Sequence, residues 1–208
     1  MQRARTPEAK DDRRLAIMTA ALDEFFEKGY APARMDDIAR RAGVSKGAVY
    51  LYFASKDALF AALIDTFAVP NVERIEAIAQ SAVSARAAID AMVAFAPVMI
   101  RQSPAPKIAR VLISNAHAFP DVVTAYRKSV IERALAAIAG FLERAKARGE
   151  IDVEAPALAA RLVVAPIVFS ALWRIVFEHD ESAHFDLDAL LRMHKTMLIR
   201  GLNMEPAP

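Results

Sequence analysis

The sequence predicts an all-α protein, and three observations carry this prediction. Hydrophobic residues make up 55% of the 208 residues but aromatic residues only 8%, so the apolar residues are mainly Ala, Leu, Ile and Val. Glycine is scarce, with 6 residues, and this composition favours helices over a sheet sandwich. Apolar residues also recur at three- and four-residue steps, the spacing of one helix face. The chain is long enough to bury a sizeable core.

The composition also excludes several classes of protein. The absence of cysteine removes disulfides, cysteine-ligated zinc, iron–sulfur clusters and thiol nucleophiles. The longest uncharged run, Leu162–Trp173, has 12 residues, short of the roughly 18 that span a bilayer. The N-terminal segment MQRARTPEAKDDRR is too polar for a signal peptide and is typical of a basic arm. We therefore expect a cytoplasmic protein with no membrane partner.

The first helix is predicted from Asp11 to Lys28, since two aspartates suit the positive end of a helix dipole and Gly29 can end it. Its apolar positions are Leu15, Met18, Leu22, Phe25 and Phe26.

Two short helices are predicted next, over Met35–Ala42 and from Lys46 to Tyr52 or Phe53. Between them, Gly43 suits a left-handed cap and Ser45 an N-cap. A fourth helix starts at Ser55 and Asp57 and is interrupted by Pro70.

Beyond residue 70, longer apolar helices are predicted near 71–80, 84–102, 105–114, 120–148, 155–178 and 186–203. Pro97 and Pro166 lie inside two of them and predict kinks rather than ends. The 120–148 segment begins with Pro120 and Asp121 and closes on basic residues before Gly149, the signature of one long helix.

A helix-turn-helix is indicated by Ala39, Gly43 and Val49: a small residue where two helices cross, a glycine at the turn and a β-branched residue that holds the second helix. Ile38, Ala42 and Val44 supply the remaining inward positions. A helical hairpin without a partner is the alternative. The net charge of +2 arises entirely from residues 1–60, which places any anionic partner there.

The segment GYAPARMDDIARRAGVSKGAVYLYFASKDALF, Gly29–Phe60, resembles the tetracycline-repressor (TetR) family of bacterial transcription regulators. FPDVVTAYRKSVIERAL, over 119–135, is similar to a C-terminal subtype of that family, the AefR-like domain. The resemblance implies a three-helix DNA-binding domain over 1–71, joined to a larger helical bundle over 72–208 that binds an effector and dimerises. It also implies a homodimer on a palindromic operator in double-stranded DNA, with no cofactor.

The second short helix is the one expected in the DNA major groove. Lys46, Ala48 and Leu51 are candidates for base contacts, and Gly47 allows close approach of the backbone. Phosphate contacts are expected from hydroxyl and amine groups. The candidates are Ser45, Tyr50, Tyr52 and Lys56, and the family resemblance implies this role for the last three.

One departure from the family pattern concerns Ala33 and Arg34, which stand where the family commonly has Thr or Ser. Arg34 cannot cap a helix well, but its guanidinium suits the same phosphate. Arg40 and Arg41 are expected on a solvated face.

The regulatory half offers mainly apolar side chains for a ligand. The candidate contacts for a small, largely apolar effector are Met92, Phe95, Met99, Ile113, His117, Phe169, Trp173 and Phe177, and Phe119 is a further apolar side chain for the pocket. An apolar stripe of this kind is more often plain core, and a histidine such as His117 is more often structural; Phe169 and Trp173, beside Pro166, are the preferred ligand contacts. The candidates for the dimer interface are Leu162, Val164, Ile167, Val168 and Leu172, on a helix that is apolar on more than one face.

Two alternatives remain. The first is a DNA-binding dimer without an effector. The second is a helical enzyme, but the sequence contains no GxxxxGK[ST], GxSxG, GxGxxG or HExxH motif. Glu178-His179-Asp180-Glu181 with His184 could be imagined as a metal site, yet that histidine spacing does not suit one helix face and the stretch reads as an acidic loop. We expect no metal.

Overall fold

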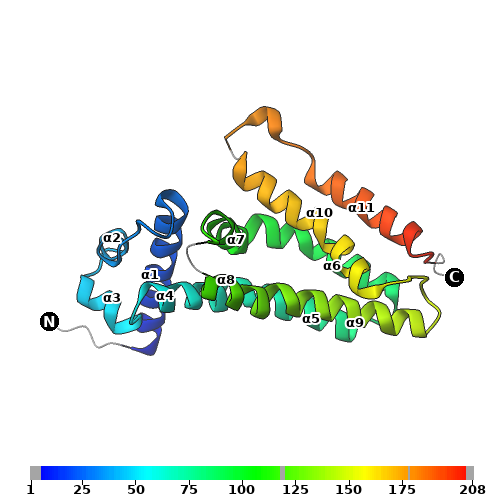
Figure 1. Ribbon diagram of the computed structural model, residues 1–208, viewed down its shortest axis with the longest axis horizontal. Coiled ribbons are helices and arrows are strands. Elements are labelled where there is room, and N and C mark those ends of the chain that lie inside the picture. The colour runs from blue at the N-terminus through cyan, green and yellow to red at the C-terminus, as the bar shows by residue number, and fades with distance from the viewer. Residues whose placement is uncertain (1–5, 118–119, 178, 205–208) are drawn as a thin grey trace. The chain divides into compact units, whose positions relative to one another are not determined.

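The computed structural model describes residues 6–117, 120–177 and 179–204, and every regular element in these ranges is helical (Figure 1). The all-α prediction is therefore confirmed. In chain order the elements are α1 (Pro7–Lys28), α2 (Met35–Arg41), α3 (Lys46–Tyr52), α4 (Lys56–Leu63), η1 (Ile64–Ala68), α5 (Val69–Ser81), α6 (Ala85–Gln102), α7 (Ala105–Ser114), α8 (Pro120–Tyr126), η2 (Arg127–Glu132), α9 (Arg133–Ala147), α10 (Pro156–Val176), η3 (Glu181–Ala183) and α11 (Leu187–Gly201).

The chain forms two compact units. The first contains the chain up to Thr66 together with Lys107–Ala125, and the second contains Phe67–Pro106 and the chain from Tyr126 onward. From the sequence, residues 107–125 are predicted to belong to the second domain. This segment lies with the first unit because the Lys107 ammonium and the Arg110 guanidinium stand 5.2 and 4.4 Å from the centre of the Phe26 ring on α1.

Local capping explains the helices of the first unit. The predicted cap at Ser45 is confirmed, and Ser55 at the predicted start of the fourth helix caps α4 in the same way, since their hydroxyls accept from the amides of Ala48 at 3.2 Å and Ala58 at 3.0 Å. The first helix begins earlier than predicted, at Pro7, because the Thr6 hydroxyl caps it and proline suits a first turn.

The turn after α1 is closed by an aromatic cluster. Gly29 ends the helix with a φ of 87°. Tyr30 is 2% exposed and its ring lies 4.9 Å from Phe25 and 5.3 Å from Phe60, in an edge-on arrangement with the latter. The buried Tyr30 hydroxyl donates to Asp57 on α4, and burial together with this carboxylate raises the pKa of Tyr30 far above its usual range.

The chain stays helical past Pro70, where the sequence predicted an interruption. The π-helix η1 lies between α4 and α5, and Pro70 stands in the first turn of α5. Proline lacks an N–H and its ring crowds the carbonyl four residues earlier, that of Thr66, which lies in the wider π turn. The predicted 120–148 helix is likewise helical from Pro120 to Ala147 but has the π segment η2 inside it.

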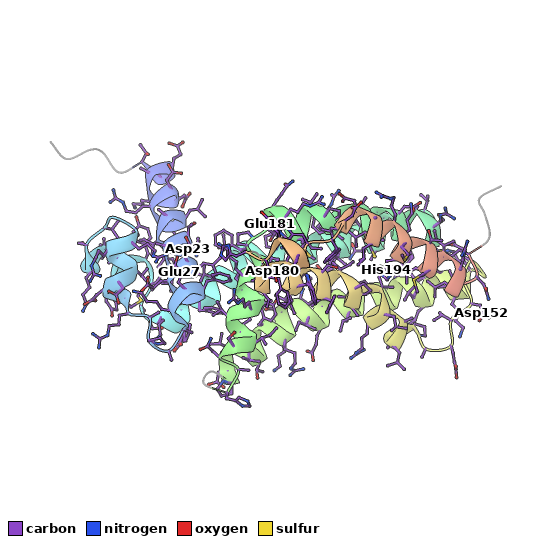
Figure 2. The ribbon with its side chains drawn as sticks, turned by 90° about the horizontal axis from the view of Figure 1, so that it is seen from above. Asp23, Glu27, Asp152, Asp180, Glu181 and His194 are labelled. Carbon is purple, nitrogen blue, oxygen red and sulfur yellow. The ribbon has the colours of Figure 1, made fainter. Side chains whose placement is uncertain are left out.

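The second unit is a helical bundle with one apolar core. The buried side chains come mainly from α5, α6, α9, α10 and α11, with α10 packed along α9 and α11 beside α6 and α10 (Figure 1). His194 on α11, labelled in Figure 2, is buried and its Nε2 donates to the Val163 carbonyl on α10 at 3.0 Å. α6 and α10 continue through Pro97 and Pro166, so neither proline ends a helix.

α10 combines two kinds of surface. By length and composition it could cross a membrane, and 28% of its most apolar stretch is buried within the chain. Its inner face, with Val163 and Ile167, belongs to the core of the second unit. Its outer face carries exposed apolar side chains, Leu158, Leu162, Phe169 and Val176.

Candidate nucleic-acid interface

The two short helices α2 and α3 are held together by the residues that the sequence singled out. Ile38, Ala39 and Val49 are buried, at 0, 3 and 0% exposure. Gly43 has a φ of 66°, the left-handed conformation that favours glycine. Because small and β-branched residues fill the contact, the opposite surface of α3 is left to solvent.

The outward surface of α3 is exposed and partly apolar. Tyr50 and Leu51 are 47 and 78% exposed, although large apolar side chains are usually buried. A Cβ added at Gly47 would meet no heavy atom within 4 Å, so the fold does not require a glycine there. These features leave the backbone and side chains of α3 open to a partner.

The remaining predicted contacts occupy different environments. Arg34 is exposed at the N-cap of α2 and makes no capping bond, as predicted. Ala48 and Tyr52 are half-buried, and the Tyr52 ring lies 6.4 Å from that of Phe53. Lys46 is exposed and paired with Asp36, whose carboxylate raises the pKa of this lysine.

Lys56 has a structural role that the sequence did not suggest. Its ammonium donates to the backbone carbonyls of Tyr30, Ala31 and Ala33, at 2.7, 3.0 and 3.1 Å. These three bonds match the three N–H donors of an ammonium. Lys56 therefore fastens the turn between α1 and α2, and burial lowers its pKa.

The adjacent arginines of α2 differ from the expectation of a shared solvated face. Arg40 is solvated, with 76% side-chain exposure and an ion pair to Asp37. Arg41 instead reaches α1, where its Nε lies 3.2 Å from the buried Glu24 and its guanidinium donates to Glu27, labelled in Figure 2. A charge pattern alone does not reveal that one of two adjacent arginines meets a buried carboxylate.

The residues proposed for a ligand are divided between the units. Ile113 and His117 lie in the first unit and are exposed. The other described candidates lie in the second unit, where Met92 is buried, Phe95 and Met99 are half-buried, and Phe169 is 57% exposed.

Three of these second-unit rings form a row. The Trp173 ring stands 5.5 Å from Phe169 and 4.5 Å from Phe177, and its Nε1 donates to the Ala183 carbonyl at 2.8 Å. Phe119 lies outside the described residues, as does Glu178 of the imagined metal site.

The five residues of α10 predicted for the dimer interface also differ in exposure. Leu162 and Val168 are exposed, at 68 and 43%. Val164 and Leu172 are half-buried, and Ile167 belongs to the core with 8% exposure.

The stretch after α10, predicted as an acidic loop, contains the short 3-10 helix η3 with Asp180 as its N-cap; Asp180 and Glu181 are labelled in Figure 2. Asp180 accepts from the amide and hydroxyl of Ser182, which lowers the pKa of this carboxyl. Within the described ranges, no group of three His, Asp or Glu residues could hold a metal ion.

Comparisons with known proteins match both parts of the chain to families. Residues 17–63 match the family of bacterial regulatory proteins named after tetR, and residues 89–186 match the C-terminal domain of AefR-like transcriptional repressors. Together the two families cover most of the chain.

Curated relatives match over the N-terminal part. The chain is 41% identical over 61 residues to the uncharacterized HTH-type transcriptional regulator YfiR of Bacillus subtilis, with 29% of this chain and 30% of that protein covered. It is 40% identical over 62 residues to the HTH-type transcriptional regulator TtgR of Pseudomonas putida, with 30% of each covered. The match thus spans less than a third of these relatives.

Solved structures match the fold over nearly the whole chain. NalD, the secondary repressor of the MexAB-OprM multidrug efflux pump in Pseudomonas aeruginosa, superposes with a TM-score of 0.71 at 23% identity, covering 94% of this chain and 98% of that one. A complex of SmeT with triclosan gives a TM-score of 0.73 at 23% identity, covering 95 and 99%.

Proposed function

Because the chain belongs to the TetR family of helix-turn-helix transcription regulators, a family without enzymatic activity, we propose that it is a repressor that binds a palindromic operator as a homodimer. A small, largely apolar molecule releases it. The observation that carries this proposal is the exposed face of α3 with Gly47, Tyr50 and Leu51, which no requirement of the fold explains. Its action on DNA places it in the bacterial cytoplasm.

In the proposed complex α3 lies in the major groove. Lys46, Ala48 and Leu51 face base edges, while Tyr50 and Arg34 reach phosphates on either side. A dimer presents two such helices to half-sites about one turn, roughly 34–36 Å, apart.

The homodimer is supported by the outer face of α10. Leu158, Leu162, Phe169 and Val176 are spaced by four and seven residues and are 63, 68, 57 and 56% exposed. This spacing places them on one helix face, and α11 adds the exposed Met193 and Met197. An exposed apolar helix face of this kind is typical of a protein–protein interface.

The proposal of an effector rests on the apolar interior of the second unit. Phe95 and Met99 on α6 are half-buried and pack against the core, so they offer apolar surface to such a molecule. Relatives support it, since SmeT has been solved with triclosan. The competing function, a dimer on DNA without an effector, is favoured by the exposure of Phe169 and Phe177, which suits an interface better than a pocket.

Two experiments on the purified protein, one after the other, test these functions. Selection from a random DNA pool should enrich a palindrome, and a gel shift on that palindrome should show release by an apolar compound. Selection without an enriched palindrome would refute operator binding. Binding that no member of a broad apolar compound library reverses would favour the dimer without an effector.

A further inference from the structure

Asp36 and Lys46 form an ion pair across the two helices of the proposed interface. Lys46 Nζ lies 2.8 Å from Oδ1 and 3.1 Å from Oδ2 of Asp36. Asp36 stands in the first turn of α2, and Lys46 is the first residue of α3. Their side chains are 52 and 60% exposed. The pair therefore lies on the outer surface at the start of α3.

The dipole of α2 favours a carboxylate in its first turn, but the neighbouring Asp37 also meets this preference, and attraction to DNA does not explain a second carboxylate. The contact between α2 and α3 is made by buried apolar residues, and an exposed ion pair adds little to stability. A carboxylate on a surface that meets phosphates is repelled by them. The exposed Asp36 carboxylate is therefore available to accept a hydrogen bond from a base edge as well as from Lys46.

The major-groove edge of a G·C pair presents the matching pattern. Guanine offers O6 and N7 as acceptors, and cytosine offers its N4 amino group as a donor. O6 and N4 are hydrogen-bonded to each other, so they lie about 3 Å apart. The separation of Lys46 Nζ from the Asp36 carboxylate oxygens, 2.8 and 3.1 Å, is similar. A lysine over guanine and a carboxylate over cytosine can therefore bind the same base pair.

We propose that Asp36 and Lys46 together read one G·C base pair in each half-site and fix its orientation, with guanine facing Lys46 and cytosine facing Asp36. This inference rests on the proposed operator binding. In the reversed pair the carboxylate faces the O6 acceptor and the ammonium faces the N4 donor, so both contacts become unfavourable. Asp36 thereby sets sequence specificity rather than overall affinity.

Selection from a random pool, with the unaltered protein and with Asp36→Asn, locates the base pair. An amide both donates and accepts, so the variant loses the part of the orientation preference that the carboxylate supplies and keeps the part that Lys46 supplies. Gel shifts then compare the selected operator with one in which that pair is reversed in one half-site. Reversal should weaken binding by the unaltered protein roughly 5- to 150-fold, the discrimination of a good base contact, and should weaken binding by the variant several-fold less, because only the Lys46 contact then discriminates.

Asp37→Asn is the matched control. It removes the same charge from the neighbouring residue, but Asp37 pairs with Arg40 at 2.9 Å. A reduced orientation preference at one symmetric position in Asp36→Asn but not in Asp37→Asn supports the inference. Equal preferences in all three proteins, or a uniform loss of affinity, overturn it and leave operator binding standing. If the unaltered protein enriches no palindrome, operator binding itself fails, and the inference fails with it.

Discussion

Replacing Lys56 with methionine should destabilise the first unit, because the Lys56 ammonium fastens the turn between α1 and α2. It donates to three carbonyls at 2.7–3.1 Å and stands 4.5 Å from the centre of the Tyr30 ring. Methionine retains the apolar stem but donates no hydrogen bond.

The size of the effect depends on how deeply the residue that carries each carbonyl is buried. Tyr30 and Ala33 are 2 and 3% exposed, whereas Ala31 is exposed and water can replace the ammonium there. Each buried carbonyl left without a donor costs about 1–3 kcal/mol. Methionine recovers part of this because it removes the desolvation of the ammonium, the same desolvation that lowers the pKa of Lys56. The expected net loss in the free energy of unfolding is about 2 kcal/mol.

Urea titration followed by far-UV circular dichroism, at one protein concentration, measures this loss. Lys10→Met is the control, since Lys10 is exposed and the charge change is the same; its urea midpoint should stay that of the unaltered protein. If the stability of Lys56→Met stays within about 0.5 kcal/mol while the salt slope of DNA affinity falls by about one, the reasoning is refuted. Lys56 would then be the phosphate contact that the family resemblance implies.

Three further changes test other parts of the molecule. Lys46→Ala combined with Tyr50→Ala should weaken operator binding in a gel shift without unfolding the protein, because both side chains are exposed on α3; unchanged affinity would count against α3 as the reading helix. Arg41→Ala should lower the free energy of unfolding by about 1–3 kcal/mol, because it leaves the buried carboxylate on α1 with one partner fewer; Arg40→Ala, on the solvated side, should change it by less than about 0.5 kcal/mol, and equal effects would contradict this. Leu162→Glu should yield monomers in analytical ultracentrifugation, because it places a charge on the outer face of α10; an intact dimer would exclude this face as the interface.

The sequence predicted the features that depend on neighbouring residues. The left-handed turn at Gly43 and the caps at Ser45 and Ser55 follow from the preferences of single residues for helix ends. The buried Val49 likewise follows from apolar spacing along one helix. Such signals are local, so they can be read without the fold.

Partners that are distant in the chain could not be predicted in this way. The carbonyls that hold Lys56 belong to residues more than twenty positions earlier. Asp36 was missed as a site residue because it meets Lys46 only after α2 and α3 have packed. The one signal available was electrostatic: a lysine at the first position of a helix opposes the helix dipole, which suggests a nearby carboxylate.

Contact between α3 and the bases can be measured directly, because the chain has no cysteine and an introduced thiol is a unique attachment point. Leu51→Cys carrying a photoreactive group should crosslink to bases at two positions of the selected operator, one helical turn apart, since this side chain is 78% exposed. The same group on Val83→Cys, 89% exposed in the second unit, should give no base crosslink. Crosslinks from position 83 and none from position 51 would show that another surface of the protein meets the DNA.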